Sequence, residues 1–144
     1  MLSVIKLATS DSDIENCFPV MAELRPHINA EHFLPTVREM EQAGYKLLCV
    51  EEGGKVVAVA GYRIGLNLFM GKHLYVDDLV TAGDVRSKGY GEQLISWLRE
   101  HAIAEGCQYF HLDSGTHRGA AHRFYFRQGF TIASYHFSEK LSDG

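Results

Sequence analysis

The segment from Gly83 to Gly91 has the residue types and the spacing that suit an anion-binding site. It lies between a strand predicted to end at Thr81 and a helix predicted to begin near Gly89. The first backbone amides of a helix have no partner inside the helix, and the helix dipole places about half a positive charge beside them. Glycines let a phosphate approach such amides closely, and an arginine and a lysine add positive charge. The segment is therefore predicted to bind a phosphate or pyrophosphate group.

Two common phosphate-binding motifs do not fit this segment. A Walker loop has Ser or Thr directly after its Gly-Lys pair, whereas Lys88 precedes Gly89 here. A dinucleotide fingerprint has a third Gly or Ala at the position that Leu94 occupies. The spacing that does fit is Arg-x-x-Gly-x-Gly, in which Arg86 is the first residue and Gly91 the last.

A second motif follows near the C-terminus. Its pattern is Ala-x-x-Phe-Tyr-x-x-x-Gly-Phe, which runs from Ala121 to Phe130 and contains Tyr125. The two motifs, the strand before the first and the amphipathic helix after it together resemble the GNAT N-acetyltransferase superfamily over essentially the whole chain. The resemblance is to its small, single-domain bacterial type.

The elements that must position these residues follow from hydrophobic periodicity. Helical spacing predicts helices over 12–24, from Asn29 or Ala30 to Gly44, over 89–105 and over 119–128. Runs rich in valine and leucine predict strands over 46–51, 55–64, 74–81 and 109–113, with one or two more within 130–141. Asp11 or Ser12 is the expected cap of the first helix. This order indicates an α/β (α+β) fold with a mixed sheet, and the resemblance implies a mostly antiparallel central sheet flanked by about four helices.

The resemblance implies a cosubstrate, acetyl-coenzyme A (acetyl-CoA), which enters between two splayed strands. Backbone groups of Leu79, Val80 and Thr81 would bind its pantetheine arm. The residues that would hold its pyrophosphate are Arg86, Ser87, Lys88, Gly89, Tyr90 and Gly91. Arg118 stands where many relatives have an asparagine that contacts the cofactor, and its guanidinium could instead reach a phosphate or an acidic group of the substrate.

The resemblance also implies catalytic roles for three residues. Tyr125 stands at the position of a tyrosine that protonates the departing sulfur, and a phenol with a pKa near 10 keeps the proton that this role requires. The alternative is that Tyr125 is a core aromatic residue. Asp77 and Asp78 look like a carboxylate pair of polyamine-type acetyltransferases, which would accept a proton, work through waters or hold the substrate ammonium. Their alternative is a structural salt bridge. Because alternate strand residues face opposite ways, one of the two is expected to face the cleft.

The expected reaction is transfer of an acetyl group from acetyl-CoA to a primary amine, by direct attack in a ternary complex. A small-molecule acceptor is favoured over a protein. The stretch from Arg118 to Tyr125 is similar to aminoalkylphosphonate acetyltransferases, which opens the possibility of an acceptor with an anionic group. The non-enzymatic alternative is a catalytically silent acyl-CoA-binding sensor or partner module with the same fold.

Histidines offer a second alternative, a metal-dependent hydrolase. His111 and Asp113 share a face of a predicted strand, and His117 and His122 follow within the next loop and helix. Four such ligands could bind a divalent ion, yet their spacing matches no recognised metal motif, so no metal is expected. The competing interpretation is that they are substrate-pocket or hydrogen-bonded histidines.

The composition narrows the class of protein. The chain has 144 residues, 14 Lys and Arg against 18 Asp and Glu, and a net charge of -4, which suits a single domain over residues 1–144 and disfavours nucleic acid as a partner. Its three cysteines form no Cys-x-x-Cys pair, and its longest apolar run is far shorter than a membrane span. A cytoplasmic protein that contacts no membrane is expected, and a homodimer through the final strands would be common for the family.

Overall fold

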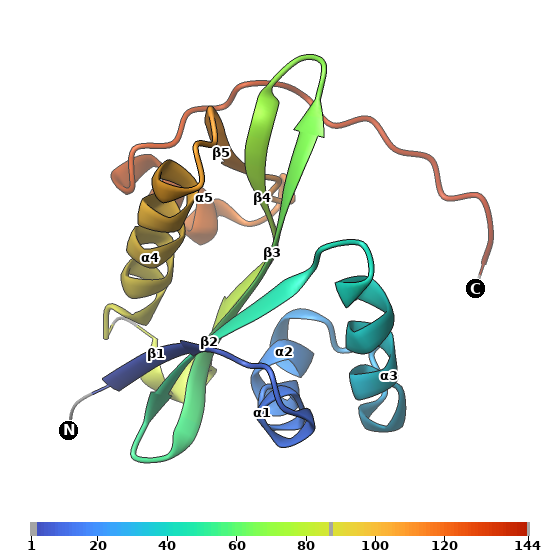
Figure 1. Cartoon of the computed structure of the whole chain (residues 1–144), viewed down its shortest axis with the longest axis vertical. Helices are drawn as coiled ribbons and strands as arrows, with labels where there is room; N and C mark the ends of the chain where they lie inside the picture. Colours follow the sequence, from blue (N-terminus) through green and yellow to red (C-terminus); the bar gives the residue numbers. More distant parts are fainter. Residues whose placement is uncertain (1–2, 87, 144) are drawn as a thin grey trace. The chain divides into compact units, whose positions relative to one another are not determined.

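Figure 1 shows the computed structural model of the chain, which describes residues 3–86 and 88–143. The residues group into two compact units, Met1–Leu112 and Asp113–Gly144, and each is described by itself. That the whole chain acts as one domain stays a prediction. Among the residues described, no helix has both the length and the apolar character needed to cross a membrane.

The first unit is built on a five-stranded sheet. Its strands follow one another in sequence order: β1 (Ser3–Leu7), β2 (Lys46–Glu52), β3 (Lys55–Asn67), β4 (Gly71–Thr81) and β5 (Tyr109–Leu112). Neighbouring strands are antiparallel except β4 and β5, which run parallel because the helix α4 (Tyr90–Ala104) connects them. The predicted mixed, mostly antiparallel sheet is confirmed.

β3 and β4 form a longer hairpin than the sequence predicts. Their pairing continues beyond Ile64↔Leu74 to Asn67↔Gly71. Asn67 stabilises the turn, because its Oδ1 accepts a hydrogen bond from the Met70 amide at 2.6 Å. The exposed apolar side chains of this tip are Leu66, Leu68 and Phe69. The sequence prediction ended β3 too early because the apolar run of that strand stops at Ile64.

β4 and β5 separate part of the way along. Their ladder runs from His73↔Tyr109 to Val76↔Leu112, whereas β4 continues beside β3 to Thr81. In an antiparallel ladder, alternate residues direct their N–H and C=O groups to the partner strand and away from it. Residues 77–81 therefore direct some backbone groups toward the side that β5 has left. The splayed strand pair implied by the resemblance is confirmed.

A β-bulge lies at Asp77. Gly61 of β3 pairs with Asp78, and the next residue of β3 pairs with Val76, so Asp77 is an extra residue in β4. A bulge of this kind interrupts the simple alternation of side chains between the two faces of a sheet. Val76 packs toward α4 before the bulge, and Leu79 does so after it. The two carboxylates in between are thereby placed on the opposite face.

Three helices cover one face of the sheet: α1 (Asp11–Asn16), α2 (Phe18–Leu24) and α3 (Ala30–Glu41). The sequence predicts one helix over 12–24, and the structure divides it at Cys17. Pro19 explains the break, since proline has no N–H to donate and its ring clashes with the carbonyl group four residues earlier. The described part of the first unit therefore has four α-helices, α1 to α4, in agreement with the expected number of about four.

Side-chain caps start two of these helices. The predicted cap at Asp11 or Ser12 is wrong, because Ser10 Oγ accepts the hydrogen bond from the Asp13 amide at 3.1 Å. Asn29 caps α3 through its side-chain oxygen, and the helix begins at the next residue as predicted. Both caps satisfy an amide that the first turn of a helix leaves without a partner.

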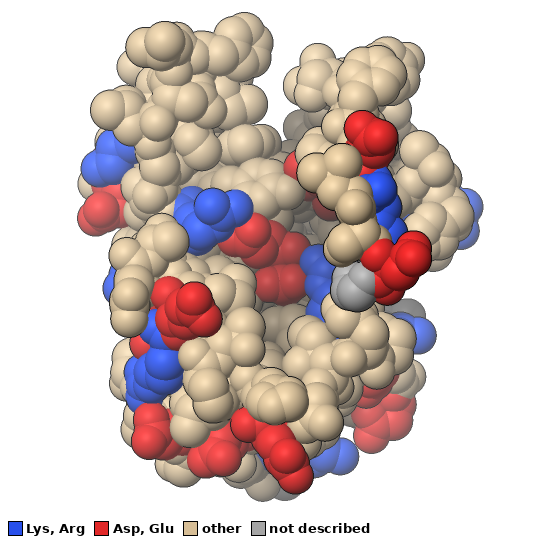
Figure 2. Space-filling model, turned by 90° about the vertical axis from the view of Figure 1, so that its right-hand side faces the viewer, with Lys and Arg blue, Asp and Glu red and all other residues tan. Residues whose placement is uncertain are grey.

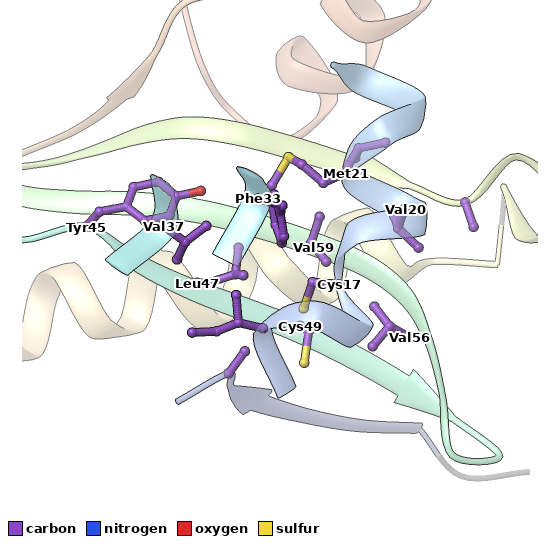
Figure 3. Packing of buried hydrophobic residues seen from close by; sticks show 14 residues of the cluster. Cys17, Val20, Met21, Phe33, Val37, Tyr45, Leu47, Cys49, Val56 and Val59 are labelled. Atoms are coloured by element: carbon purple, nitrogen blue, oxygen red, sulfur yellow. The ribbon is translucent and has the colours of Figure 1, made fainter. Parts of the chain in front are cut away.

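Two apolar cores lie on opposite faces of the sheet. Figure 3 shows the first, in which Cys17, Phe33 and Val37 from the helices pack over sheet residues such as Leu47 and Val59. The second core packs α4 against the other face of β2, β3 and β4. Its fully buried helix residues include Leu94 and Leu98. The sheet is thus held rigidly between two layers of helices.

The second unit contains the helix α5 (Gly119–Arg127), which agrees with the predicted helix over 119–128. The strands predicted within 130–141 are not found among the described residues, which run as an extended segment in Figure 1. A strand needs ladder bonds to a neighbour, and the described part of this unit contains no other strand. The exposed apolar side chains of the segment are Ile132, Tyr135, Phe137 and Leu141.

Candidate active site

Asp77 and Asp78 point to the same face of the sheet, the one covered by α1, α2 and α3. Arg63 of β3 binds the side chain of Asp77, and Arg25 and Tyr45 bind that of Asp78. These five residues are called the carboxylate cluster below. Strand alternation predicts opposite faces for the two aspartates, and this is wrong, because the bulge at Asp77 interrupts the alternation. Which of them faces the cleft stays a prediction.

Asp78 is the more enclosed carboxylate, with a side chain 13% exposed against 21% for Asp77. Arg25 Nε donates to Asp78 Oδ1 at 3.0 Å, and Tyr45 Oη donates to Asp78 Oδ2 at 2.8 Å. Arg25 Nη2 also donates to the Asp77 carbonyl oxygen at 3.0 Å. One guanidinium therefore joins the bulge backbone to the neighbouring carboxylate. Burial raises the pKa of Tyr45 well above its ordinary value and the charge of Asp78 adds to this, so the phenol keeps its proton and donates.

Gly61 makes room for this arrangement. A Cβ atom at position 61 would overlap the hydroxyl and ring of Tyr45. Gly61 is also the residue that pairs with Asp78 across the ladder. The missing side chain therefore lets the tyrosine lie over β3 and reach the carboxylate on β4.

Arg63 holds Asp77 in a bidentate ion pair. Its Nε donates to Asp77 Oδ2 at 2.8 Å, and its Nη2 donates to Asp77 Oδ1 at 2.9 Å. The guanidinium carbon also lies 5.6 Å from the centre of the Tyr75 ring. Each carboxylate of the cluster thus has an arginine partner. This is the arrangement that the structural salt-bridge alternative requires, and it leaves Asp77 as the more accessible of the two carboxylates.

Sequence reasoning did not find Arg25, Tyr45 or Arg63 as parts of the cluster. They come from the residue after α2, the residue before β2 and the middle of β3, and no local motif joins them. The one local signal is Gly61, because a glycine inside an apolar strand indicates close approach by another group.

The segment 83–91, called the glycine loop below, joins β4 to α4, and its role as an anion site stays a prediction. A 3-10 turn over Gly83–Val85 follows β4, and α4 begins at Tyr90 with Gly89 as its N-cap. The φ angle of Gly89 is 86°, in the left-handed region that favours glycine. Gly89 has no side chain to accept from the first amides of α4, so these amides can bind an external anion. The side chains of Arg86 and Lys88 are exposed.

The cofactor residues predicted on β4 lead directly into this loop. Leu79 packs toward α4, and Val80 is buried in the opposite core. Their side chains are structural, so what residues 79–81 can offer a ligand is backbone. Of the predicted cofactor residues, those at 79–81 and 86 come before Ser87, which lies outside the described residues, and those at 88–91 come after it.

Tyr125 and Arg118 belong to the second unit. Tyr125 lies on α5, and its ring centroid is 5.5 Å from that of Phe124 and 6.0 Å from that of Phe130. Burial raises the pKa of Tyr125, against a smaller opposing effect of Arg118. The phenol is therefore protonated at neutral pH, which is the state that a proton donor needs. The aromatic packing also agrees with the core-residue alternative.

His111 pairs with His73 of the neighbouring strand. The distance from His111 Nε2 to His73 Nδ1 is 2.9 Å, and His73 Nε2 lies 3.3 Å from Asn67 Nδ2. The Oδ1 atom of Asn67 accepts a turn amide, so Nδ2 is the group that donates to His73, which in turn donates to His111. His122, in the second unit, contacts the Gly115 carbonyl oxygen at 2.8 Å. No group of three or more His, Cys, Asp or Glu within the described ranges could hold a metal ion.

Opposite charges lie side by side over the face of the molecule in Figure 2, where Lys and Arg side chains are interspersed with Asp and Glu side chains. The ion pairs include Lys6 with Glu51 at 3.0 Å and Arg38 with Asp11 at 2.6 Å. General nucleic-acid binding depends on a field of unpaired positive charge, so this face does not favour it.

Comparison with known proteins gives a family match and two relatives. A family model described as the acetyltransferase (GNAT) family matches residues 12–130. The uncharacterized N-acetyltransferase YhdJ of Bacillus subtilis (strain 168) is 35% identical over 139 residues, which cover 95% of this chain and 98% of the relative. An aminoalkylphosphonate N-acetyltransferase of Salmonella typhimurium is 30% identical over 83 residues, which cover 53% of this chain and 54% of the relative.

The fold is also found among solved structures. A transcriptional regulator from Bacillus halodurans matches with a TM-score of 0.87 and 21% identity, over 97% of this chain and 100% of that chain. At this identity the likeness concerns the fold alone. The family match covers most of the chain, and the Bacillus subtilis relative matches along nearly its whole length. The chain therefore belongs to the GNAT family and is an acetyltransferase.

Proposed function

We propose that this protein moves an acetyl group from acetyl-CoA to a primary amine of a small-molecule acceptor, by direct attack in a ternary complex. The observation that carries the proposal is that the part of β4 beyond its ladder with β5 is followed, on the two sides of Ser87, by the 3-10 turn and by the start of α4. Backbone groups of residues 79–81 would bind the pantetheine arm. The amides at the start of α4, together with Arg86, would bind the pyrophosphate.

The reaction needs one proton donor and one proton acceptor. The acceptor ammonium first loses a proton to Asp77 or through waters to the solvent, and its nitrogen lone pair then attacks the thioester carbonyl carbon. The C–N bond forms, and the C–S bond breaks as the departing sulfur takes the phenolic proton of Tyr125. The attacking nitrogen then releases its second proton, which restores the phenol. The raised pKa of Tyr125 supports this role, because it keeps the donor protonated at neutral pH.

The carboxylate cluster would bind the acceptor. Asp77 is the more accessible carboxylate and would contact the ammonium, whereas Asp78 would keep its structural partners Arg25 and Tyr45. An ammonium at Asp77 would share that carboxylate with Arg63, whose guanidinium could then also pair with an acid group on the same acceptor. A relative named for aminoalkylphosphonates supports an acceptor that carries both groups. Arg118 is a further candidate partner for such an acid group.

A thiol-release assay with acetyl-CoA and a panel of amines tests this function. The panel contains aminoalkylphosphonates, amino acids, polyamines and aminoglycosides. We expect thiol release with at least one amine, and a decrease in kcat of about 10²-fold or more for Tyr125→Phe with unchanged coenzyme A (CoA) affinity. Tyr135→Phe, at an exposed position, is the matched control. Binding of acetyl-CoA without thiol release for any amine would instead indicate the catalytically silent sensor.

A further inference from the structure

Glu23, in the last turn of α2, contacts the start of the glycine loop. Its Oε1 accepts a hydrogen bond from the Gly83 amide at 2.8 Å. The same oxygen lies 3.8 Å from Arg86 Nη2. A carboxylate of the protein itself thus lies against the arginine that the proposed function assigns to the pyrophosphate.

The contact depends on the residue at position 83. A Cβ atom there would lie 3.2 Å from Glu23 Oε1 and 3.9 Å from the guanidinium carbon of Arg86. Glycine therefore lets the carboxylate come close to the backbone and to the arginine at the same time. Two other acids lie in or next to the glycine loop: Asp84, whose carboxylate faces Lys55 at 3.9 Å, and Glu92 in the first turn of α4. Of the three, Glu23 is the acid whose described ion pair is with Arg86.

The ion pair between Glu23 and Arg86 is exposed enough for another anion to replace Glu23 as the partner of Arg86. The side chain of Arg86 is 65% exposed and that of Glu23 is 39% exposed. Ion pairs at this exposure contribute little to stability, because water screens them. A pyrophosphate carries more negative charge than one carboxylate and offers several oxygens to a guanidinium. It can therefore take the arginine from Glu23, while the Gly83 amide keeps its carboxylate acceptor.

We propose that Glu23 is a built-in counter-ion of Arg86, displaced by the pyrophosphate of CoA, and that it thereby sets the affinity for this cosubstrate. The inference rests on the proposed function. In the free protein Glu23 holds the start of the glycine loop and neutralises Arg86. In the complex, Arg86 exchanges this carboxylate for the pyrophosphate, and the lost ion pair lowers the net affinity.

The test is calorimetric titration of the full chain with CoA. Glu23→Gln keeps an oxygen that can accept from Gly83 and removes the charge that pairs with Arg86. We expect it to bind CoA about twofold to fivefold more tightly than the natural chain, the factor that an exposed ion pair corresponds to. Asp84→Asn also removes one negative charge close to the start of α4, but from a carboxylate that pairs with Lys55 and not with Arg86, and it should leave the affinity nearly unchanged. Unchanged thermal unfolding of both variants shows that each is folded.

Two further titrations test whether the gain in affinity depends on Arg86 and on the pyrophosphate. In an Arg86→Ala background the gain from Glu23→Gln should vanish, because there is no guanidinium to release. With dephospho-CoA, which keeps the pyrophosphate and lacks the 3′-phosphate, the gain should persist. Weaker binding by Glu23→Gln, an equal gain for Asp84→Asn, a gain that survives Arg86→Ala, or a gain lost with dephospho-CoA would each overturn the inference. A natural chain that does not bind CoA would overturn the proposed function itself.

Discussion

The glycine loop and the carboxylate cluster adjoin the same strand, β4, and they are built in different ways. The glycine loop is a run of consecutive residues whose proposed binding groups are backbone amides at the start of α4. The carboxylate cluster consists of side chains from distant parts of the chain that meet over a bulge. The first should be sensitive to backbone conformation, and the second to the space and partners around each side chain.

The largest loss of stability is expected at Gly61, where Tyr45 of the carboxylate cluster leaves no space for a side chain. Gly61→Ala would place a Cβ atom on the Tyr45 ring, so the tyrosine must move and Asp78 loses a donor. We expect the free energy of unfolding to decrease by about 3 kcal/mol, which a urea denaturation curve measures. The control is Gly44→Ala, which has no atom within 4 Å and a φ of 94°, so that backbone strain is its main effect. Equal losses in the two variants would contradict the role assigned to close packing.

In the glycine loop, we expect the affinity for CoA to depend on the backbone conformation of Gly89. Gly89 has a φ of 86° and no atom within 4 Å of the position of a Cβ, so Gly89→Ala adds strain of about 1–2 kcal/mol without a steric clash. We expect about tenfold weaker binding of CoA in calorimetry. Gly106→Ala, at a φ of 76° with nothing within 4 Å, is the matched control after α4 and should keep the full affinity. The same loss in both variants would argue against a local role of Gly89.

Two buried tyrosines, Tyr45 and Tyr62, differ in whether the hydroxyl group has a hydrogen-bond partner among the described residues. Tyr45→Phe removes the donor to Asp78, and we expect a loss of about 1.5–2 kcal/mol in the free energy of unfolding, as for a hydrogen bond to a charged group. The Tyr62 hydroxyl is buried and has no hydrogen-bond partner among the described residues. Tyr62→Phe should therefore leave the stability unchanged or raise it. A loss of similar size in both variants would show that burial alone is responsible.

Because these two tyrosines are buried, we expect the stability to decline at alkaline pH. Burial raises the pKa of Tyr45 well above its ordinary value and that of Tyr62 to about 12. Above pH 10 the unfolded chain ionises first, so the contribution of each group is complete below pH 10 and decreases by about 1.4 kcal/mol per pH unit above it. Urea curves between pH 9 and 11 should show a shallower decline for Tyr45→Phe. An unchanged slope would contradict a protonated, buried phenol.

Only a small loss of stability is expected at Arg63. Its ion pair with Asp77 is half-exposed, and Arg63→Gln should lower the free energy of unfolding by less than about 1 kcal/mol. If Arg63 and Asp77 bind the acceptor, the same variant should raise the KM for the amine and leave CoA affinity unchanged. A loss of stability as large as that of Gly61→Ala would place Arg63 among the structural residues instead.

The contrast between the two regions also explains what the sequence could predict. The glycine loop depends on consecutive residues, so the pattern of Arg86, Gly89 and Gly91 is readable in the sequence. The splayed pair of β4 and β5 could be predicted from the family resemblance. The partners of Asp77 and Asp78 depend on pairing between distant strands, and no local pattern records that pairing.

The other differences between the predicted and the observed elements have physical causes that hydrophobic spacing does not record. Apolar spacing over 12–24 predicts one helix, and the backbone effect of Pro19 outweighs that spacing. The bulge at Asp77 cannot be read from alternation, because it is an exception to alternation. Apolar residues within 130–141 suggested strands, but a strand forms only against a partner, which the described part of that unit does not contain.

The bulge at Asp77 also determines where the chain can change in length. It places Leu79 and Val80 in opposite cores, and removing one residue beside it would exchange their faces and turn two apolar side chains away from their packing partners. The hairpin tip at 66–70 has no such constraint, since its side chains are mostly exposed and a longer loop adds little entropy loss. Insertions and deletions are therefore tolerated at the tip of β3 and β4, and excluded a few residues further along the same strand.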